Sequence, residues 1–465
     1  MKRAVLLFIL FLTLSASAQE QENYMEKANY YYSNLNYEQA FEYYFLELEA
    51  RPNQYNNIKS RLQTLLLYDV NKSIADELRI ALLKKTQEKP DNEQFAKLLM
   101  WFALQQEDYD IALEQCKGLD RRFNDQDAQL ITIAHICFDN AQYELAKDAF
   151  EYLITKGKIN PYYGDAVVGA VKTENQLCKI NNVKDTKTYE RLSKRIEDSY
   201  SEIGSKEYPN LAEIQADIMA YQLGKSQDAI ELLLRVIGQT NDKIQKNRLK
   251  LKLADIYLYN DEVWEATLLY SQVDKAMKEE PLGHEARYRN AQLRYFIGEF
   301  AWAETQLHVL KAATSKLVAN DAMSLSLIIG DNLEADTSGM ELKRLARADY
   351  KIYQHRDDEA LPILDSICRD GNEISKPHAL FRLAELKEKK HLYDEAVQSY
   401  LQIVTEFPDS YMADDALMHA ALLEDQQLRS KEAAKQHYEQ LIDEYPTSLY
   451  TAQAKKNYRK LAVGS

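Results

Sequence analysis

The sequence contains little glycine or proline: 13 Gly and 9 Pro in 465 residues. Strand-and-turn folds need more of these residues at their tight turns, so their scarcity argues against a β-rich protein. Hydrophobic residues make up 46% of the chain and charged residues 28%, which is typical of a globular protein and not of a disordered one. Composition therefore favours a helical fold.

Cysteine is also scarce, with four residues, Cys116, Cys137, Cys178 and Cys368, and no CxxC pair. Four scattered cysteines do not form the framework of a small disulfide-rich domain. We expect buried thiols, because free cysteine is among the most buried residue types. If a disulfide exists, Cys116 to Cys137 is the best candidate, since the repeat pattern described below places them on facing helices. Two touching thiols in a core are the alternative.

Motifs of catalysis are missing as well. The chain has no Gly-rich phosphate loop, no dinucleotide-binding glycine motif, no HExxH and no nucleophile elbow. Its eight histidines are spread along the sequence without metal-ligand spacing. We therefore expect a non-enzymatic protein with no catalytic residues, no cofactor and no metal. The net charge of −15 argues against nucleic acid as a partner.

The N-terminus has the layout of a secretory signal. Lys2 and Arg3 precede an apolar run, which ends at the small-x-small sequence Ala16-Ser17-Ala18. We expect residues 1–18 to be removed, leaving an exported protein, most simply periplasmic, without a transmembrane segment. Gln19 would be the first mature residue, and the absence of cysteine there argues against a lipid anchor. An uncleaved N-terminal anchor is the alternative.

A short pattern recurs along the rest of the chain: an aromatic or apolar residue, alanine three positions later and a large apolar residue four further on. Its copies are Tyr37-Ala40-Tyr44, Tyr109-Ala112-Cys116, Tyr143-Ala146-Phe150, Val263-Ala266-Tyr270, Phe300-Ala303-Leu307 and Tyr393-Ala396-Tyr400, with weaker ones around Ala229, Ala360 and Ala434. Most steps between successive alanines are 34 to 38 residues, steps of 72 and 83 fit two repeats, and a step of 57 fits one repeat plus an extra helix. Such a period is typical of a helical repeat array.

Each repeat is predicted to be a helical hairpin. Another small residue lies twelve positions before the alanine in most copies, as Ala28, Ala134 and Ala384 show. Small residues on two facing helices allow close packing, and a proline such as Pro52 or Pro408 ends the second helix. The sequence therefore predicts an all-α fold.

These features resemble the tetratricopeptide repeat (TPR) family, best over residues 24–52, 130–158 and 380–408. The resemblance implies a right-handed superhelical solenoid of antiparallel helix pairs, with about 10–11 repeats including degenerate ones. The stretch "EFPDSYMADDALMHAALLED" is similar to exported periplasmic members of the family in Gram-negative bacteria, such as outer-membrane assembly lipoproteins and cell-division coordinators. Residues 319–332 resemble exported repeat proteins of Bacteroidota-like bacteria.

We expect four segments. Residues 1–18 are the signal peptide, 19–159 an N-terminal repeat array, 160–207 a degenerate repeat or hinge and 208–465 a C-terminal repeat array. The last segment should contain an extra helix near 315–333 and a capping helix at 448–462, whose basic residues fit a polar outer face.

Candidate partner-binding residues lie one, four or five positions after a small residue on the first helix of a repeat, where this architecture has its concave groove. They are Asn29, Tyr32, Trp101, His135, Phe138, Asp255, Tyr259, Tyr288, Gln292, Tyr295 and Phe296. Each could instead serve inter-repeat packing or face solvent. The resemblance implies a scaffold that binds a protein or peptide in this groove and organises a cell-envelope complex. A glycan-binding accessory of an envelope enzyme and a self-associating structural array are the alternatives, and the oligomeric state and the partner stay open.

Overall fold

The computed structural model of the chain describes residues 23–69, 72–204, 206–313 and 316–463, and the expected signal peptide lies outside these ranges. These ranges hold helices and no strand, which confirms the predicted all-α repeat solenoid. The helices form two compact units. One unit comprises Met1–Asn181 with Asp198–Glu207, and the other comprises Asn182–Glu197 with Tyr208–Ser465, so the expected hinge at 160–207 contributes to both.

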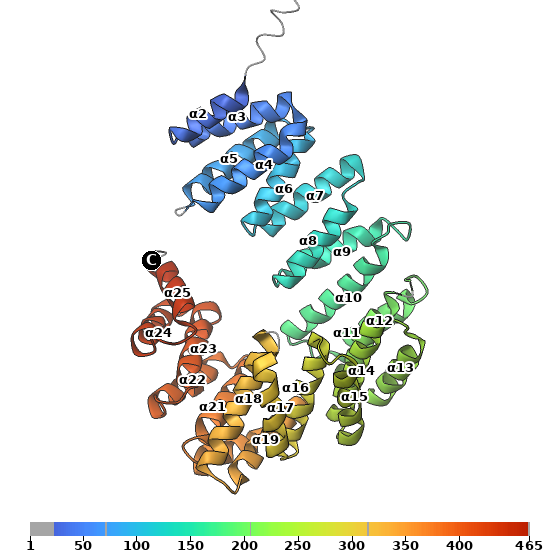
Figure 1. Ribbon diagram of the computed structural model, residues 1–465, viewed down its shortest axis with the longest axis vertical. Helices are drawn as coiled ribbons and strands as arrows, with labels where there is room; N and C mark the ends of the chain where they lie inside the picture. Colours follow the sequence, from blue (N-terminus) through green and yellow to red (C-terminus); the bar gives the residue numbers. More distant parts are fainter. Residues whose placement is uncertain (1–22, 70–71, 205, 314–315, 464–465) are drawn as a thin grey trace, which may run out of the picture. The chain divides into compact units, whose positions relative to one another are not determined.

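The first unit consists of successive antiparallel helices (Figure 1). They are α2 (Tyr24–Ser33), α3 (Tyr37–Ala50), η1 (Pro52–Gln54), α4 (Tyr55–Leu67), α5 (Ser73–Glu88), α6 (Glu93–Gln105), α7 (Tyr109–Phe123), α8 (Asp127–Asp139), α9 (Tyr143–Thr155) and α10 (Tyr163–Ile180). The helix α11 (Thr186–Ser199) follows and belongs mostly to the second unit.

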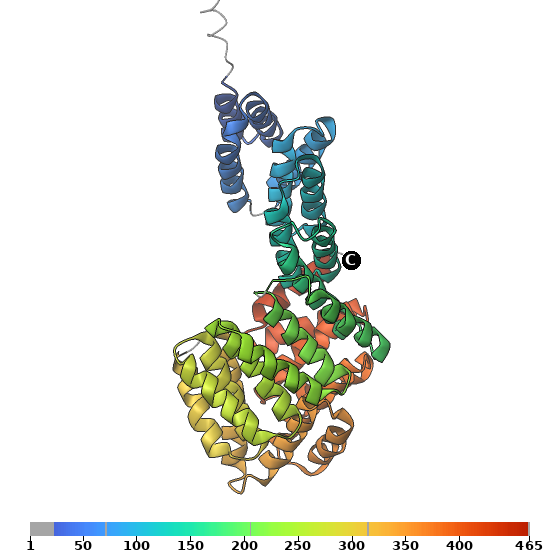
Figure 2. The same ribbon diagram turned by 90° about the vertical axis from the view of Figure 1, so that its right-hand side faces the viewer.

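The second unit continues the same alternation. Its helices are α12 (Tyr208–Asp217), the π-helix η2 (Ile218–Gln222), α13 (Ser226–Gln239), α14 (Lys243–Tyr259), α15 (Val263–Ala276), α16 (Pro281–Phe296), α17 (Phe300–Ala313), α18 (Lys316–Ala335), α19 (Met340–Tyr353), α20 (Asp357–Asp370), α21 (Ser375–Lys389), α22 (Tyr393–Glu406), α23 (Ala413–Gln426), α24 (Lys431–Glu444) and α25 (Thr451–Val463). Figure 2 shows the middle helices of this unit, from green to orange, packed side by side. The helix α18 stands between two pairs and packs mainly on α17.

One turn geometry joins the two helices in most pairs. A residue with positive φ ends the turn, as at Leu35, Ala141 and Asp261. The next backbone N–H then donates to a carbonyl five positions earlier, for example Gln142 to Cys137 at 2.8 Å. This is the six-to-one hydrogen bond of a Schellman cap, and it satisfies a carbonyl in the last turn of the first helix in these pairs.

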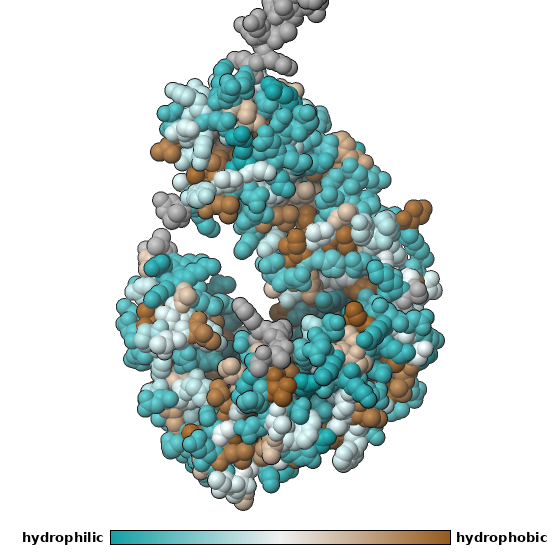
Figure 3. All heavy atoms as spheres, viewed as in Figure 1, coloured by the Kyte–Doolittle hydropathy of each residue, from teal (hydrophilic) through white to brown (hydrophobic). Residues whose placement is uncertain are grey.

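The small residues of the repeat pattern are fully buried, with exposed fractions of 0% for Ala40, Ala146 and Ala396. Their partners on the first helices, such as Ala28 and Ala384, are also 0% exposed. A larger side chain would hold the paired helices apart, so alanine spacing sets the packing distance. On the face of the molecule that Figure 3 shows, hydrophilic residues predominate and hydrophobic residues form small groups.

The cysteines are free thiols. Cys116 and Cys137 belong to one buried cluster of the first unit, and no disulfide joins them. Burial raises the pKa of Cys116 to about 12 and that of Cys137 to about 11. The structure therefore has the two thiols in a core, the second of the two alternatives.

Candidate functional site: the inner side of the second unit

The first helices of successive pairs in the second unit contact one another, in the order α12, α14, α16, α19 and α21. They also interact across a longer interval. The Tyr350 hydroxyl of α19 donates to the Leu258 carbonyl of α14 at 2.9 Å, and the Gln354 amide donates to the Tyr259 carbonyl at 3.2 Å. First helices that are next but one along the chain, as α14 and α19 are, can meet in this way only on the inner side of a curve. The inner side of the second unit is therefore formed by first helices.

A carboxylate on one first helix binds an arginine of the next. Asp255, directly after Ala254 in α14, accepts a hydrogen bond from the Tyr270 hydroxyl at 2.7 Å and pairs with Arg289 of α16. Burial alone would lower the pKa of Arg289, but the carboxylates of Asp255 and Glu285 raise it above its usual value. The guanidinium is therefore charged and held by the protein itself.

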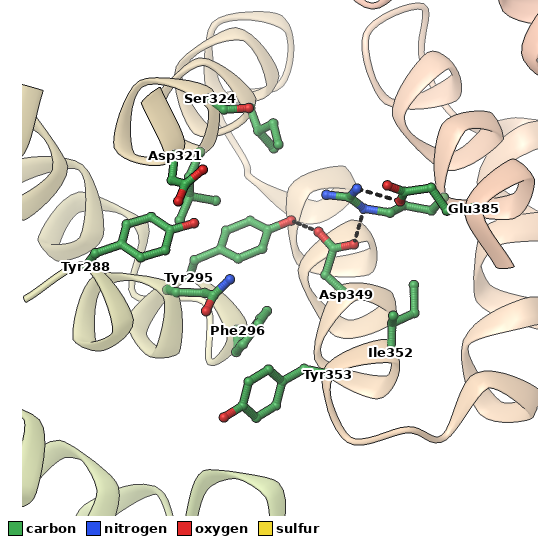
Figure 4. Close-up of a pocket in the computed structure, with 13 residues that line it drawn as sticks. Tyr288, Tyr295, Phe296, Asp321, Ser324, Asp349, Ile352, Tyr353 and Glu385 are labelled. Carbon is green, nitrogen blue, oxygen red and sulfur yellow. Dashed lines mark hydrogen bonds and ion pairs between the residues drawn. The ribbon is translucent and has the colours of Figure 1, made fainter. Parts of the chain in front are cut away.

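The same arrangement recurs between the next two first helices, α19 and α21. Asp349, directly after Ala348 in α19, accepts from the Tyr295 hydroxyl at 2.9 Å and from Arg382 Nε of α21 at 2.9 Å (Figure 4). Arg382 also donates to Glu385 at 2.8 Å. The Asp349 carboxylate raises the pKa of Arg382, so this guanidinium also stays charged.

The first unit has two variants of this link. Asn29, after Ala28, accepts from the Tyr44 hydroxyl at 3.1 Å and from Arg61 at 2.8 Å. His135, after Ala134, lies 3.1 Å from the Asp165 carboxylate of α10. The position after the small residue thus ties one first helix to the next in four places, and at these places its side chain already has partners within the chain.

Two adjoining cavities open on the inner side of the second unit. The Asp321 cavity has a volume of about 320 Å³. Its lining consists of Tyr288, Gln292, Tyr295, Phe296, Asp321, Ser324, Leu325, Ile328, Asp349, Ile352, Tyr353, Arg382 and Glu385. The Asp255 cavity has a volume of about 400 Å³. Its lining consists of Tyr221, Asp255, Tyr270, Arg289, Gln292, Ile352, Tyr353 and His355.

Gln292 differs from the other residues that follow a first-helix alanine. It lines both cavities, it is half-buried, and its amide makes no hydrogen bond to any residue that the structure describes. Tyr353, which also borders both cavities, donates from its hydroxyl to the Asp255 carbonyl at 3.2 Å. The junction of the two cavities therefore offers one amide donor and acceptor beside aromatic rings, a combination suited to the backbone of an extended peptide.

Five predicted groove residues line these cavities: Asp255, Tyr288, Gln292, Tyr295 and Phe296. Tyr295 and Phe296 are only 1% and 9% exposed, so they form the floor.

The remaining predicted residues lie outside the cavity linings. Tyr259 packs its ring on Tyr221 at a centroid distance of 4.9 Å. In the first unit, the Tyr32 ring contacts the Tyr37 ring, and Lys172 Nζ lies 4.2 Å from the centroid of the Phe138 ring. Trp101 is 8% exposed and packs in the hydrophobic cluster of the first unit.

Sequence reasoning missed much of the lining. Asp349, Ile352 and Tyr353 follow Ala348 by one, four and five positions, so the spacing rule would have found them. Asp321 and Ser324 lie on α18, which has no repeat pattern, so the sequence holds no signal for the face they occupy.

The comparisons with known proteins agree with this repeat geometry. The tetratricopeptide repeat family model matches residues 378–410 and 415–448, which correspond to α21–α22 and α23–α24. Two helix pairs near the C-terminal end of the chain therefore match the tetratricopeptide repeat model. No curated protein matches it.

Three solved structures match the chain at low sequence identity and low TM-score. "Structure of Naa15/Naa10 bound to HypK-THB" matches 94% of this chain at 11% identity and a TM-score of 0.32, and this chain covers 65% of that one. The match with the P58(IPK) TPR domain covers 87% of this chain and 97% of that one, at 14% sequence identity and a TM-score of 0.22. The match with a monomeric mutant of IFIT1 with m7Gppp-AAAA covers 88% of this chain and 90% of that one, at 12% sequence identity and a TM-score of 0.31.

Two kinds of feature are absent from the described residues. No cluster of three or more His, Cys, Asp or Glu side chains is arranged to hold a metal ion there. Within the same ranges, none of the helices combines the length and the apolar character needed to cross a bilayer.

Proposed function

We propose that the chain is a non-catalytic scaffold whose second unit binds an extended segment of a protein partner on its inner side. The observation that carries this proposal is the Gln292 amide, which has no hydrogen-bond partner among the described residues and lies at the junction of two cavities lined by tyrosine and phenylalanine. A peptide backbone needs a donor and an acceptor in such a place, and aromatic side chains contribute contact area at low entropy cost. The tetratricopeptide repeats support a role in protein–protein interaction.

The cellular place of this scaffold is part of the proposal. The signal-like N-terminus and the C-terminal resemblance support export to the periplasm and a role in organising a cell-envelope complex. Cell fractionation combined with N-terminal sequencing of the purified protein tests export. A mature protein that begins at Gln19 in the periplasmic fraction supports it, and an intact Met1 terminus in the cytoplasm contradicts it.

Site-specific photo-crosslinking tests binding on the inner side. A photoreactive amino acid at Gln292 should capture a partner protein in cells. The matched control is the same amino acid at Leu268, a 59% exposed position of α15 in the same unit that lines neither cavity. A defined product from Gln292 that is absent from Leu268 supports the proposal. Equal products at both positions, or capture of glycan in place of protein at Gln292, contradict it.

A further inference from the structure

The charges that line the two cavities do not balance. Four carboxylates line them, Asp255, Asp321, Asp349 and Glu385, but only two guanidinium groups, Arg289 and Arg382. Both arginines are already held by carboxylates, as described above. The net charge of the two cavity linings is therefore negative.

The uncompensated charge lies at Asp321. Its carboxylate has no hydrogen bond or ion pair to any residue that the structure describes, whereas Asp255, Asp349 and Glu385 each bind an arginine. Partial burial and the neighbouring Glu285 carboxylate raise the pKa of Asp321. A cation placed here would relieve this repulsion without displacing any internal pair.

The surroundings of Asp321 have the shape and chemistry that a long cationic side chain needs. Figure 4 shows Tyr288 of α16 and Asp321 of α18 projecting toward the same part of the cavity. An ammonium or guanidinium group gains energy on a tyrosine ring face as well as from a carboxylate. Leu325 and Ile328 line the same cavity and offer an apolar surface for the methylene stem.

Resting on the proposed function, we infer that the partner segment is basic and places a lysine or arginine side chain in the Asp321 cavity, with its charged head between Asp321 and the Tyr288 ring. The Gln292 amide then holds the backbone of the segment, and the charged side chain sets its register along the inner side. The excess of carboxylates selects a basic segment over an acidic one.

A peptide library tests this inference on the full chain. Random dodecapeptides displayed on phage are selected on the immobilised protein, and the enriched peptides are measured by fluorescence anisotropy. We expect enrichment of lysine or arginine. Asp321→Asn should weaken the enriched peptides roughly 2- to 5-fold, as expected for a solvent-exposed charge pair. Asp228→Asn is the matched control, because Asp228 is an exposed carboxylate of α13 that lines neither cavity, and should leave affinity unchanged.

A second variant separates charge from folding. Replacing the enriched lysine or arginine of the peptide by glutamine should weaken binding to the wild-type chain and have little further effect on Asp321→Asn, because the same pair is lost in both cases. Full additivity of the two changes overturns the inference, as does enrichment of acidic or neutral peptides. If Gln292→Ala still lowers the affinity of such acidic or neutral peptides, the proposed function stands and the inference of a basic segment is wrong. If no peptide is retained and Gln292 captures no protein, both fall.

Discussion

Asp349 offers the sharpest test of how the first helices are tied together. Its carboxylate is 11% exposed and accepts hydrogen bonds from Tyr295 and Arg382. Asp349→Ala leaves the Tyr295 hydroxyl, in a side chain 1% exposed, without a partner, which costs about 1–3 kcal/mol. Arg382 keeps Glu385, so the loss of its second partner adds only about 1 kcal/mol. We expect the free energy of unfolding to fall by about 2–4 kcal/mol in total.

Urea unfolding followed by circular dichroism at 222 nm measures this change. Asp358→Ala is the control, because the Asp358 side chain is 95% exposed and should alter stability by less than about 0.5 kcal/mol. A double-mutant cycle with Tyr295→Phe isolates the hydrogen bond, and we expect a coupling of about 1 kcal/mol. Additivity of the two substitutions within about 0.3 kcal/mol would refute the reasoning.

Three further predictions concern packing, protonation and thiol reactivity. Gly169→Ala places a Cβ 2.3 Å from the buried Phe150 ring and should destabilise the first unit by about 1–3 kcal/mol, whereas Gly238→Ala, with nothing within 4 Å, should not destabilise the chain. Burial lowers the pKa of His378 to about 3, far below its unfolded value of about 6.5, so the free energy of unfolding should fall as pH drops from 6.5 toward 3, by at most about 1.4 kcal/mol per pH unit. Urea unfolding measured across this pH range should show a shallower dependence on pH for His378→Asn than for the wild-type chain. An unchanged dependence contradicts the prediction. Burial raises the pKa of Cys116 to about 12, so a thiol reagent at pH 8 should modify it only after unfolding, and rapid labelling of the native protein would show the packing to be wrong.

The sequence alone determined the secondary structure and its pairing. The alanine spacing predicted where helices face each other, because a small residue at that position permits close packing whatever lies elsewhere in the chain. Ala40, Ala146 and Ala396 are indeed fully buried. The same local rule placed Tyr288 and Gln292 on the inner side, since one helix face follows from a period of 3.6 residues.

Only the tertiary structure decided which of these positions are occupied by internal partners and which stay open. Asp255 and Gln292 hold equivalent positions after an alanine, yet Asp255 binds Arg289 and the Gln292 amide has no described partner. Each partner lies on a neighbouring first helix, and the carboxylate that α19 brings to α16 is Asp349, which binds Tyr295. The inserted helix α18 brings Asp321 to the cavity. Local sequence sets which way a side chain faces, but what it meets there depends on how far the neighbouring helices are shifted and on which of them is inserted.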